Sequence, residues 1–392
     1  KELANKYTAD YATSYTGGYY ANVASGDLVT ELNDWLFEDS RVIGDSAVIA
    51  TEYGIHIIYF AGEGEPYWKI SVIQALKDEK SAHLMESYAE LYGVESENLF
   101  LANGSDDILN FAFMAYCANG RKSYFADITY GFYSVFANLH GSDYTEIPLE
   151  EDFSIDYKKF CGVDGGVFIA NPNAPTGLEL GLDAVEEVIK SNPDNVVVID
   201  EAYVDFGGES ASSLVKKYDN LLVVQTFSKS RSMAGARLGF AIGNKEIIGD
   251  LHKLRYSTNP YNINRLTLAA GEATIDSQSY YDDNCKKIIE TREWTISELK
   301  KLGFEILPSK ANFIFAKNDK IDGERLYLEL KEQGVLVRHF TSQRIKAYNR
   351  ITIGTPEQMQ VLVEKIKDII TLVFLFIINT SLNKLCNRTY YI

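Results

Sequence analysis

The sequence contains few cysteine, histidine and proline residues for its length. Its 392 residues include 4 Cys, 5 His and 8 Pro. The cysteines, Cys117, Cys161, Cys285 and Cys386, form no Cys-x-x-Cys pair and have no histidine nearby. This scatter argues against a zinc site and is typical of a reducing compartment. The sequence therefore predicts no metal site and a cytoplasmic protein.

Positive charge and long apolar runs are also scarce. The net charge is −17, which argues against a nucleic-acid partner or a generic membrane surface. Residues 1–17 are polar and lack the apolar core of a signal peptide. The longest apolar run, Ile369–Ile378, would make about 15 Å of helix, half a bilayer. We therefore expect no membrane span, and this run is either a helix end that packs on the body or an exposed appendage.

A chain of this length is too long for one compact core, and its pattern predicts an α/β fold. Short apolar strands alternate with helical segments from residue 98, as in a mostly parallel sheet with helices on its faces. The predicted strands are Leu99–Ala102, Ser123–Ala126, Tyr144–Ile147, Val167–Ala170, Val196–Ile199, Leu221–Thr226 and Leu238–Ile242.

After residue 260 the pattern changes to a smaller α+β domain. We expect a helix over Tyr280–Leu302, and strands at Phe304–Leu307, Phe313–Ala316, Val335–Arg338 and Arg350–Ile353. The predicted organisation is an N-terminal segment (1–65), a large domain (66–260), a small domain (261–370) and an atypical tail (371–392).

Lys229 follows the apolar strand Leu221–Thr226, within Thr226-Phe227-Ser228-Lys229, and stands eight positions before Arg237. Ligand sites of open α/β sheets lie at such strand ends. A lone lysine is usually a solvated surface charge. A lysine in a partly dry pocket can instead form a Schiff base with an aldehyde. Thr226, Ser228 and Arg237 would then serve a phosphate on the same molecule.

Two other strand ends carry residues of matching chemistry. Gly104-Ser105-Asp106 opens a helix, where free N–H groups make a phosphate seat, although Ser105 could equally be a plain helix cap. Tyr130 could offer its ring face to a planar cofactor, or could be a core residue.

Asn173, in a proline-rich loop, could donate to an aromatic oxygen or merely form a turn.

A carboxylate and two arginines complete the set of candidates. Asp200 ends the buried run Val196–Ile199, and such a carboxylate needs a cationic partner unless it caps a helix. A protonated pyridine nitrogen would serve, and Tyr203 could hydrogen-bond a neighbouring ring oxygen. Arg338 and Arg350 lie at strand edges of the small domain, where arginine binds carboxylate or phosphate or is simply exposed.

Together these signals meet the requirements of pyridoxal 5'-phosphate. The chain resembles the fold-type I aminotransferases, and most closely the histidinol-phosphate aminotransferase family, over residues 86–370. The segments that carry the resemblance are Gly104–Asp107, Thr129–Gly131, Asn171–Gly177, Asp200–Tyr203, Ser228–Arg237 and Arg350–Thr355.

The resemblance implies a dimeric enzyme that uses an amino donor and a 2-oxo acid in histidine biosynthesis. Lys229 would bind the cofactor covalently and move the substrate proton. Asp200 would pair with the pyridine nitrogen, Tyr203 and Asn173 would contact the ring oxygen, and Tyr130 would stack on the ring. The phosphate would be held by Gly104, Ser105, Asp106, Thr226, Ser228 and Arg237. Arg350 would take a carboxylate, and Arg338 the phosphate of histidinol phosphate.

The chain departs from the family pattern in several places. Ala174 stands where the family has Asn, the N-terminal motif of the family is only faintly echoed at Phe60–Tyr67, a Tyr-Pro loop is missing between Ala75 and Ser87, and the tail beyond Asp368 is foreign. Alternatives are an aromatic or broad-range aminotransferase, a decarboxylase of phosphorylated amino acids, and a catalytically impaired or silent homologue.

Overall fold

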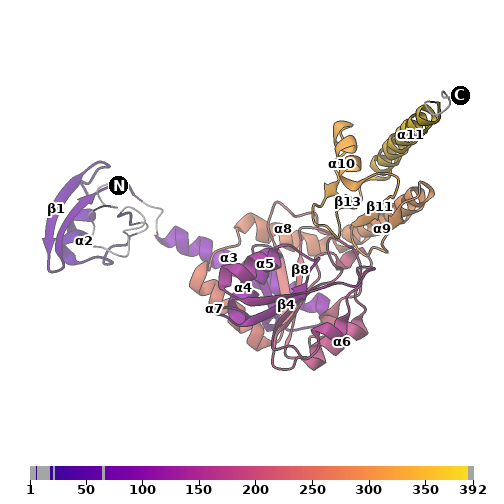
Figure 1. Cartoon of the computed structure of the whole chain (residues 1–392). Coiled ribbons are helices and arrows are strands. Elements are labelled where there is room, and N and C mark those ends of the chain that lie inside the picture. Colours follow the sequence, from indigo (N-terminus) through magenta and orange to yellow (C-terminus); the bar gives the residue numbers. More distant parts are fainter. Residues whose placement is uncertain (1–5, 7–17, 21–22, 64–66, 387–392) are drawn as a thin grey trace. The chain divides into compact units, whose positions relative to one another are not determined.

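The structure is a computed structural model. It describes residues 6, 18–20, 23–63 and 67–386, and of residues 67–78 and 373–386 the backbone alone. The chain divides into two compact units, Lys1–Glu79 and Lys80–Ile392. Each unit is described by itself (Figure 1).

In residues 23–63 of the first unit, the structure describes one hairpin and one short helix. The hairpin strands pair antiparallel, with Val48 opposite Ile57. Thr51 and His56 are hydrogen-bonded at 2.8 Å across the hairpin. The elements are α2 (Thr30–Leu36), β1 (Ser46–Thr51) and β2 (Gly54–Tyr59), and α3 (Tyr67–Tyr92) crosses into the second unit.

The centre of the second unit is a seven-stranded sheet in the order β3-β9-β8-β7-β6-β4-β5, parallel except for β9. All seven predicted strands are present within two residues of their expected bounds. They are β3 (Leu99–Ala102), β4 (Lys122–Ala126), β5 (Asp143–Ile147), β6 (Gly165–Ala170), β7 (Val197–Asp200), β8 (Leu221–Thr226) and β9 (Gly239–Gly243).

Helices cover both faces of this sheet because successive strand side chains alternate between the faces. On one face, Val198 belongs to a hydrophobic core cluster that the sheet forms with α4 (Ser105–Tyr116), α5 (Phe132–His140) and α7 (Lys245–Thr258). On the opposite face, Val197 and Ile199 belong to a second hydrophobic core cluster, which includes residues of α3, α6 (Leu182–Ser191) and α8 (Arg265–Asp276). Short 3-10 turns complete this part: η2 (Ser96–Asn98), η3 (Tyr157–Phe160), η4 (Val204–Phe206) and η5 (Ala211–Leu214). The predicted α/β fold is confirmed.

The small lobe is a four-stranded antiparallel sheet in the order β10-β11-β13-β12. Its strands are β10 (Glu305–Ile306), β11 (Phe313–Lys317), β12 (Arg338–His339) and β13 (Tyr348–Thr352). Leu299, Leu326 and Ile366 bury its helices against it. These are α9 (Gln278–Lys301), α10 (Gly323–Glu332) and α11 (Pro356–Cys386).

The strand predicted at Val335–Arg338 is displaced toward the C-terminus. Only Arg338 and His339 pair with β13, opposite Arg350 and Asn349. Val335 instead donates its N–H to the Leu330 carbonyl at the end of α10, at 2.9 Å, and Leu336 is exposed. The apolar run was a misleading strand signal because its first residues close a helix.

The apolar tail continues α11, which runs to Cys386. Ile366 and Ile369 are fully buried in the small-lobe core, whereas Leu372 is 63% exposed. Ile369 therefore belongs to the small-lobe core, although it lies just beyond Asp368, where the foreign tail was expected to begin. Within the described part of the chain, no helix has the length and apolar run needed to cross a membrane.

A chain ending at Leu372 is expected to keep the unfolding free energy to within about 0.5 kcal/mol, since it retains the buried Ile369 and ends at the exposed Leu372. A chain ending at Asp368 also loses Ile369, which we expect to cost about 2–5 kcal/mol, as for other large apolar core deletions. Thermal unfolding of both chains beside the full chain tests this. Equal stability of the two truncated chains would contradict the burial of Ile369.

Candidate active site

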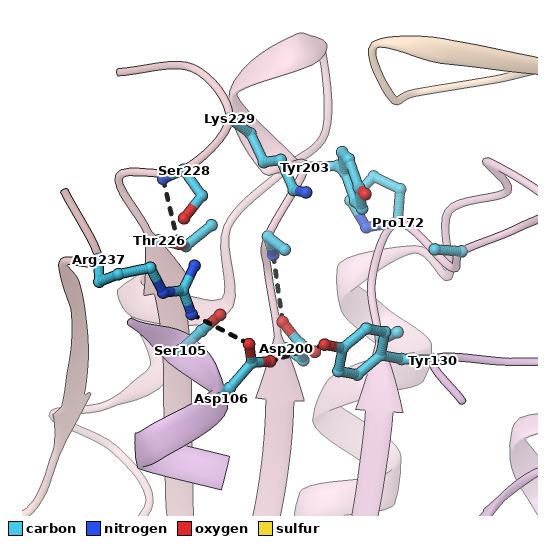
Figure 2. A pocket seen from close by; sticks show the side chains of 13 residues that line it. Ser105, Asp106, Tyr130, Pro172, Asp200, Tyr203, Thr226, Ser228, Lys229 and Arg237 are labelled. Atoms are coloured by element: carbon cyan, nitrogen blue, oxygen red, sulfur yellow. Dashed lines mark hydrogen bonds and ion pairs between the residues drawn. The ribbon is translucent and has the colours of Figure 1, made fainter. Parts of the chain in front are cut away.

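A cavity opens at the carboxyl edge of the large sheet (Figure 2). The last residues of β6, β7 and β8 line this cavity; they are Ala170, Asp200 and Thr226. Loops and the start of α4 supply the remaining lining residues: Ser105, Asp106, Tyr130, Pro172, Ala174, Ala202, Tyr203, Ser228, Lys229 and Arg237. Parallel strands thus bring together side chains that are up to 132 positions apart, from Ser105 to Arg237.

Lys229 reaches this cavity from the turn that follows β8. The turn is fixed where the Ser228 N–H donates to Thr226 Oγ1 at 3.1 Å. The Lys229 amine is directed toward the Tyr203 ring, with Nζ 5.2 Å from the ring centroid (Figure 2). Among the described residues, no carboxylate forms an ion pair with this amine. It is therefore available to react with a ligand.

The start of α4 forms an anion seat. Gly104, and not Ser105, is the cap residue, and no side chain caps the helix. Gly104 has φ +92°, and a Cβ there would lie 2.6 Å from Arg237 Nη2. Because the first N–H groups of a helix lack internal partners, this end with Arg237 beside it favours a phosphate.

Asp106 orients the groups around that seat. Its Oδ2 forms an ion pair with Arg237 Nη2 at 3.1 Å, and its Oδ1 accepts from the Tyr130 hydroxyl at 2.6 Å. A carboxylate repels a phosphate, so only the backbone N–H of Asp106 suits a bound phosphate. Its side chain instead holds Tyr130 at the cavity wall.

Asp200, the last residue of β7, is a buried carboxylate. Its Oδ2 accepts from the Tyr133 hydroxyl at 2.9 Å and its Oδ1 from the Ala202 N–H at 3.3 Å. Burial raises the pKa of the Asp200 carboxyl to about 6. No cation of the described residues lies within ion-pair distance, so this carboxylate suits a positively charged ligand group.

Tyr133 is a site residue that the sequence reasoning missed. It is fully buried, and its ring meets the Tyr130 ring edge to face at 5.7 Å. The spacing of three residues from Tyr130 was the available signal, because such residues share one side of a helical turn.

Glu201, the second carboxylate after the β7 run, faces away from the cavity. It accepts from Ser210 Oγ, the Ala211 N–H and Gln225 Nε2, at 2.6, 2.6 and 2.8 Å. Burial raises its pKa to about 7. The pair Asp200-Glu201 therefore divides into a cavity carboxylate and a structural one.

Asn173 is placed beside the cavity but does not line it. Its side-chain nitrogen donates to the Ile128 carbonyl and to Thr176 Oγ1, at 2.9 and 3.1 Å. Its Oδ1 accepts from Thr129 Oγ1 at 2.8 Å. The amide thus holds the loop together, and the neighbouring Ala174 reaches the wall.

Arg338 and Arg350 are direct cross-strand partners, and neither lines the cavity just described. Arg350 lies over the Phe313 ring at 5.1 Å, and Phe313 meets the Tyr203 ring at 5.0 Å. Tyr203 in turn lies beside Lys229. This series of contacts extends the site from the lysine to the small-lobe arginines.

Two family models match separate parts of the chain. Residues 72–366 match the model of aminotransferase class I and II. Residues 1–63 match the model of the PPIC-type PPIASE domain. The N-terminal departure from the aminotransferase pattern therefore coincides with a match to a second family.

Named relatives support the first match. The histidinol-phosphate aminotransferase of Brachyspira hyodysenteriae is 52% identical over 313 residues, 78% of this chain and 88% of the relative. The crystal structure of the Clostridium acetobutylicum histidinol-phosphate aminotransferase has TM-score 0.69 at 25% identity, covering 76% of this chain and 90% of that one. The Sinorhizobium meliloti enzyme, solved in complex with pyridoxal-5'-phosphate, has TM-score 0.69 at 20% identity, covering 79% and 88%. The chain belongs to the pyridoxal phosphate-dependent class I and II aminotransferases, in the histidinol-phosphate aminotransferase group.

Proposed function

We propose that this chain transfers the amino group of L-histidinol phosphate to 2-oxoglutarate, with pyridoxal 5'-phosphate as cofactor, in histidine biosynthesis. The proposal rests mainly on one observation: the Lys229 amine, the buried Asp200 carboxylate and the anion-binding start of α4 line the same cavity. Family membership and the 52% identity to a relative named for this activity support the substrate.

The residues of the cavity fit this cofactor. A buried carboxylate without a cation is costly, and a pyridinium nitrogen at Asp200 would remove that cost. The α4 start and Arg237 suit a phosphate. When bound, pyridoxal phosphate supplies the aldehyde and the electron-withdrawing ring that amino-group transfer requires.

The chain's own residues would share the remaining work. Lys229 would bind the aldehyde and move a proton at the substrate Cα. Asp200 would keep the pyridine nitrogen protonated, and Tyr133 would hold Asp200 in place. Tyr130 would cover the ring, and Tyr203 would donate to the ring oxygen. We assign no ring contact to Asn173, because its amide is fully engaged within the protein.

The phosphate of the substrate and the carboxylates of the amino-acid pair require cations outside the cofactor seat. Like charges directly opposite in a sheet are destabilising, so adjacent Arg338 and Arg350 need a counter-charge. The described residues form no ion pair with either. The pair therefore suits anionic substrates, with Arg350 binding a carboxylate and Arg338 the phosphate.

Replacing Arg338 by leucine is expected to weaken the binding of L-histidinol phosphate by about ten- to a hundredfold, which is the contribution of one charge-assisted hydrogen bond. An unphosphorylated aromatic amino acid should be nearly unaffected, since it lacks the phosphate. Steady-state KM values for both donors provide the measurement.

Equal losses for both donors would assign Arg338 to folding or to a shared carboxylate, and would favour an aromatic or broad-range aminotransferase. Release of carbon dioxide from a phosphorylated amino acid would favour the decarboxylase alternative. One absorbance spectrum of the purified protein, before and after L-histidinol phosphate is added, tests the proposal itself. Absence of a cofactor band after reconstitution would favour a silent homologue.

We also infer a homodimer that works in the cytoplasm. Phe132, Val135 and Leu139 on α5 and Leu266 on α8 are apolar side chains between 48 and 82% exposed in the single chain. Such exposure favours a subunit contact. Sedimentation of the holoenzyme gives its mass.

A further inference from the structure

Arg344 joins the two lobes of the second unit at the edge of the site. It lies in the turn between β12 and β13, which carry Arg338 and Arg350. Its Nη1 forms an ion pair with Asp127 Oδ2 at 2.7 Å. Its Nη2 donates to the carbonyls of Leu149 and Glu150, at 2.9 and 3.0 Å. One guanidinium thus has three acceptors on the large lobe.

Asp127 is firmly placed, since it directly follows β4. Its N–H donates to the Ile147 carbonyl at 3.0 Å, and its Oδ1 accepts from the Leu149 N–H at 2.9 Å. It also precedes the loop that delivers Tyr130 to the cavity. Arg344 is therefore attached to the same sheet edge that builds the cofactor site.

An aromatic cluster supports this attachment. Phe153 from the large lobe meets Phe315 and Tyr348 edge to face, at 6.1 and 5.4 Å. The Arg344 guanidinium lies 5.7 Å from the Phe153 ring centroid. Ile345, next to Arg344, is buried in the large-lobe core cluster. The turn between the two arginine strands is thus packed against the large lobe.

We propose that Arg344 is a positioning residue for substrate: it fixes the β12–β13 turn to the large lobe, so that Arg338 and Arg350 are held at the distance from Lys229 that the substrate anion requires. The inference rests on the proposed function in taking those two arginines as substrate-binding. An exposed ion pair alone contributes little to stability. A planar guanidinium that donates to three oxygens at once, however, restricts the position of the turn that carries it. Lysine cannot reproduce that geometry.

The test compares Arg344→Met, Arg344→Lys and Asp127→Asn with Lys346→Met, which removes an exposed cation from the same turn. In the holoenzyme, Arg344→Met should raise KM for L-histidinol phosphate by about tenfold and leave kcat within about twofold, because the chemistry at Lys229 is untouched. Arg344→Lys and Asp127→Asn should change KM in the same direction, and Lys346→Met should not.

A second readout is independent of turnover. Hydrogen exchange of the amides of residues 339–347 should become faster in Arg344→Met and Asp127→Asn, measured on the protein without substrate. Faster exchange with an unchanged KM would overturn the inference, because Arg344 would then serve stability only. Unchanged exchange would overturn it as well.

The outcome can be separated from failure of the proposed function. If the holoenzyme shows no transamination, the dissociation constant for L-histidinol phosphate, measured by calorimetry, replaces KM. Loss of affinity in Arg344→Met would still support positioning of an anion site. No binding by the unaltered holoenzyme would remove both proposals.

Discussion

Lys229→Ala is expected to lower transamination by at least about a thousandfold, because this substitution removes both the amine that binds the aldehyde and the group that moves the Cα proton. The visible absorbance that arises when the cofactor is bound to this lysine should be absent. Cofactor binding itself should persist, weakened, because the α4 start and Arg237 are unchanged. Initial rates and an absorbance titration of the variant with pyridoxal phosphate provide the two measurements.

The matched control is Lys216→Ala, which removes an exposed lysine elsewhere in the large lobe. It should keep full turnover and the normal spectrum. Turnover near the original rate in Lys229→Ala would refute the assignment of the site. Loss of cofactor binding together with loss of folding, seen by thermal unfolding, would instead show that Lys229 stabilises the empty cavity.

Asp200→Asn is expected to have the second largest effect, a fall in kcat of about a hundredfold or more. The neutral amide cannot hold the pyridine nitrogen protonated, so the ring accepts electrons less well. Rapid-mixing absorbance of the bound cofactor, with L-histidinol phosphate alone, isolates this first half of the reaction. The matched control is Glu201→Gln, at the adjacent buried carboxylate that faces away from the cavity, and its half-reaction should be little changed.

The same substitution gives a stability signature in the absence of cofactor. The folded-state pKa of Asp200, about 6, lies above the ordinary value of 3.8. A raised carboxyl pKa means that the folded state disfavours the charge. Stability is therefore lost as the pH rises from about 4 to 6, by about 3 kcal/mol in total. Asp200→Asn should accordingly raise the apo melting temperature at pH 7 relative to the original chain, and not at pH 4. A melting temperature that falls at pH 7 would contradict an uncompensated charge.

Much of the fold could be predicted because local pattern and tertiary environment agree. Each strand of the parallel sheet is buried on both faces and therefore appears in the sequence as a short apolar run, as Val196–Ile199 and Leu221–Val224 do. The position of Lys229 after such a run indicated that it would reach the carboxyl edge. The short strand β12 was misplaced because the apolar residues before it close α10, and periodicity does not distinguish these two uses.

The sequence pattern by itself determined the class of fold, and the resemblance to known aminotransferases indicated the family and predicted that Lys229, Asp200, Tyr130 and Arg237 share one site. Tertiary structure alone decided which polar side chains face that cavity. The Asn173 side chain is hydrogen-bonded within the protein, and Glu201 accepts hydrogen bonds on the side away from the cavity. Tyr133, on α5, donates a hydrogen bond to Asp200 at the end of β7. The link from Arg344 to Asp127 joins residues 217 positions apart. The physical reason is that hydrogen-bond partners are set by three-dimensional packing, whereas strand and helix patterns are local properties of the chain.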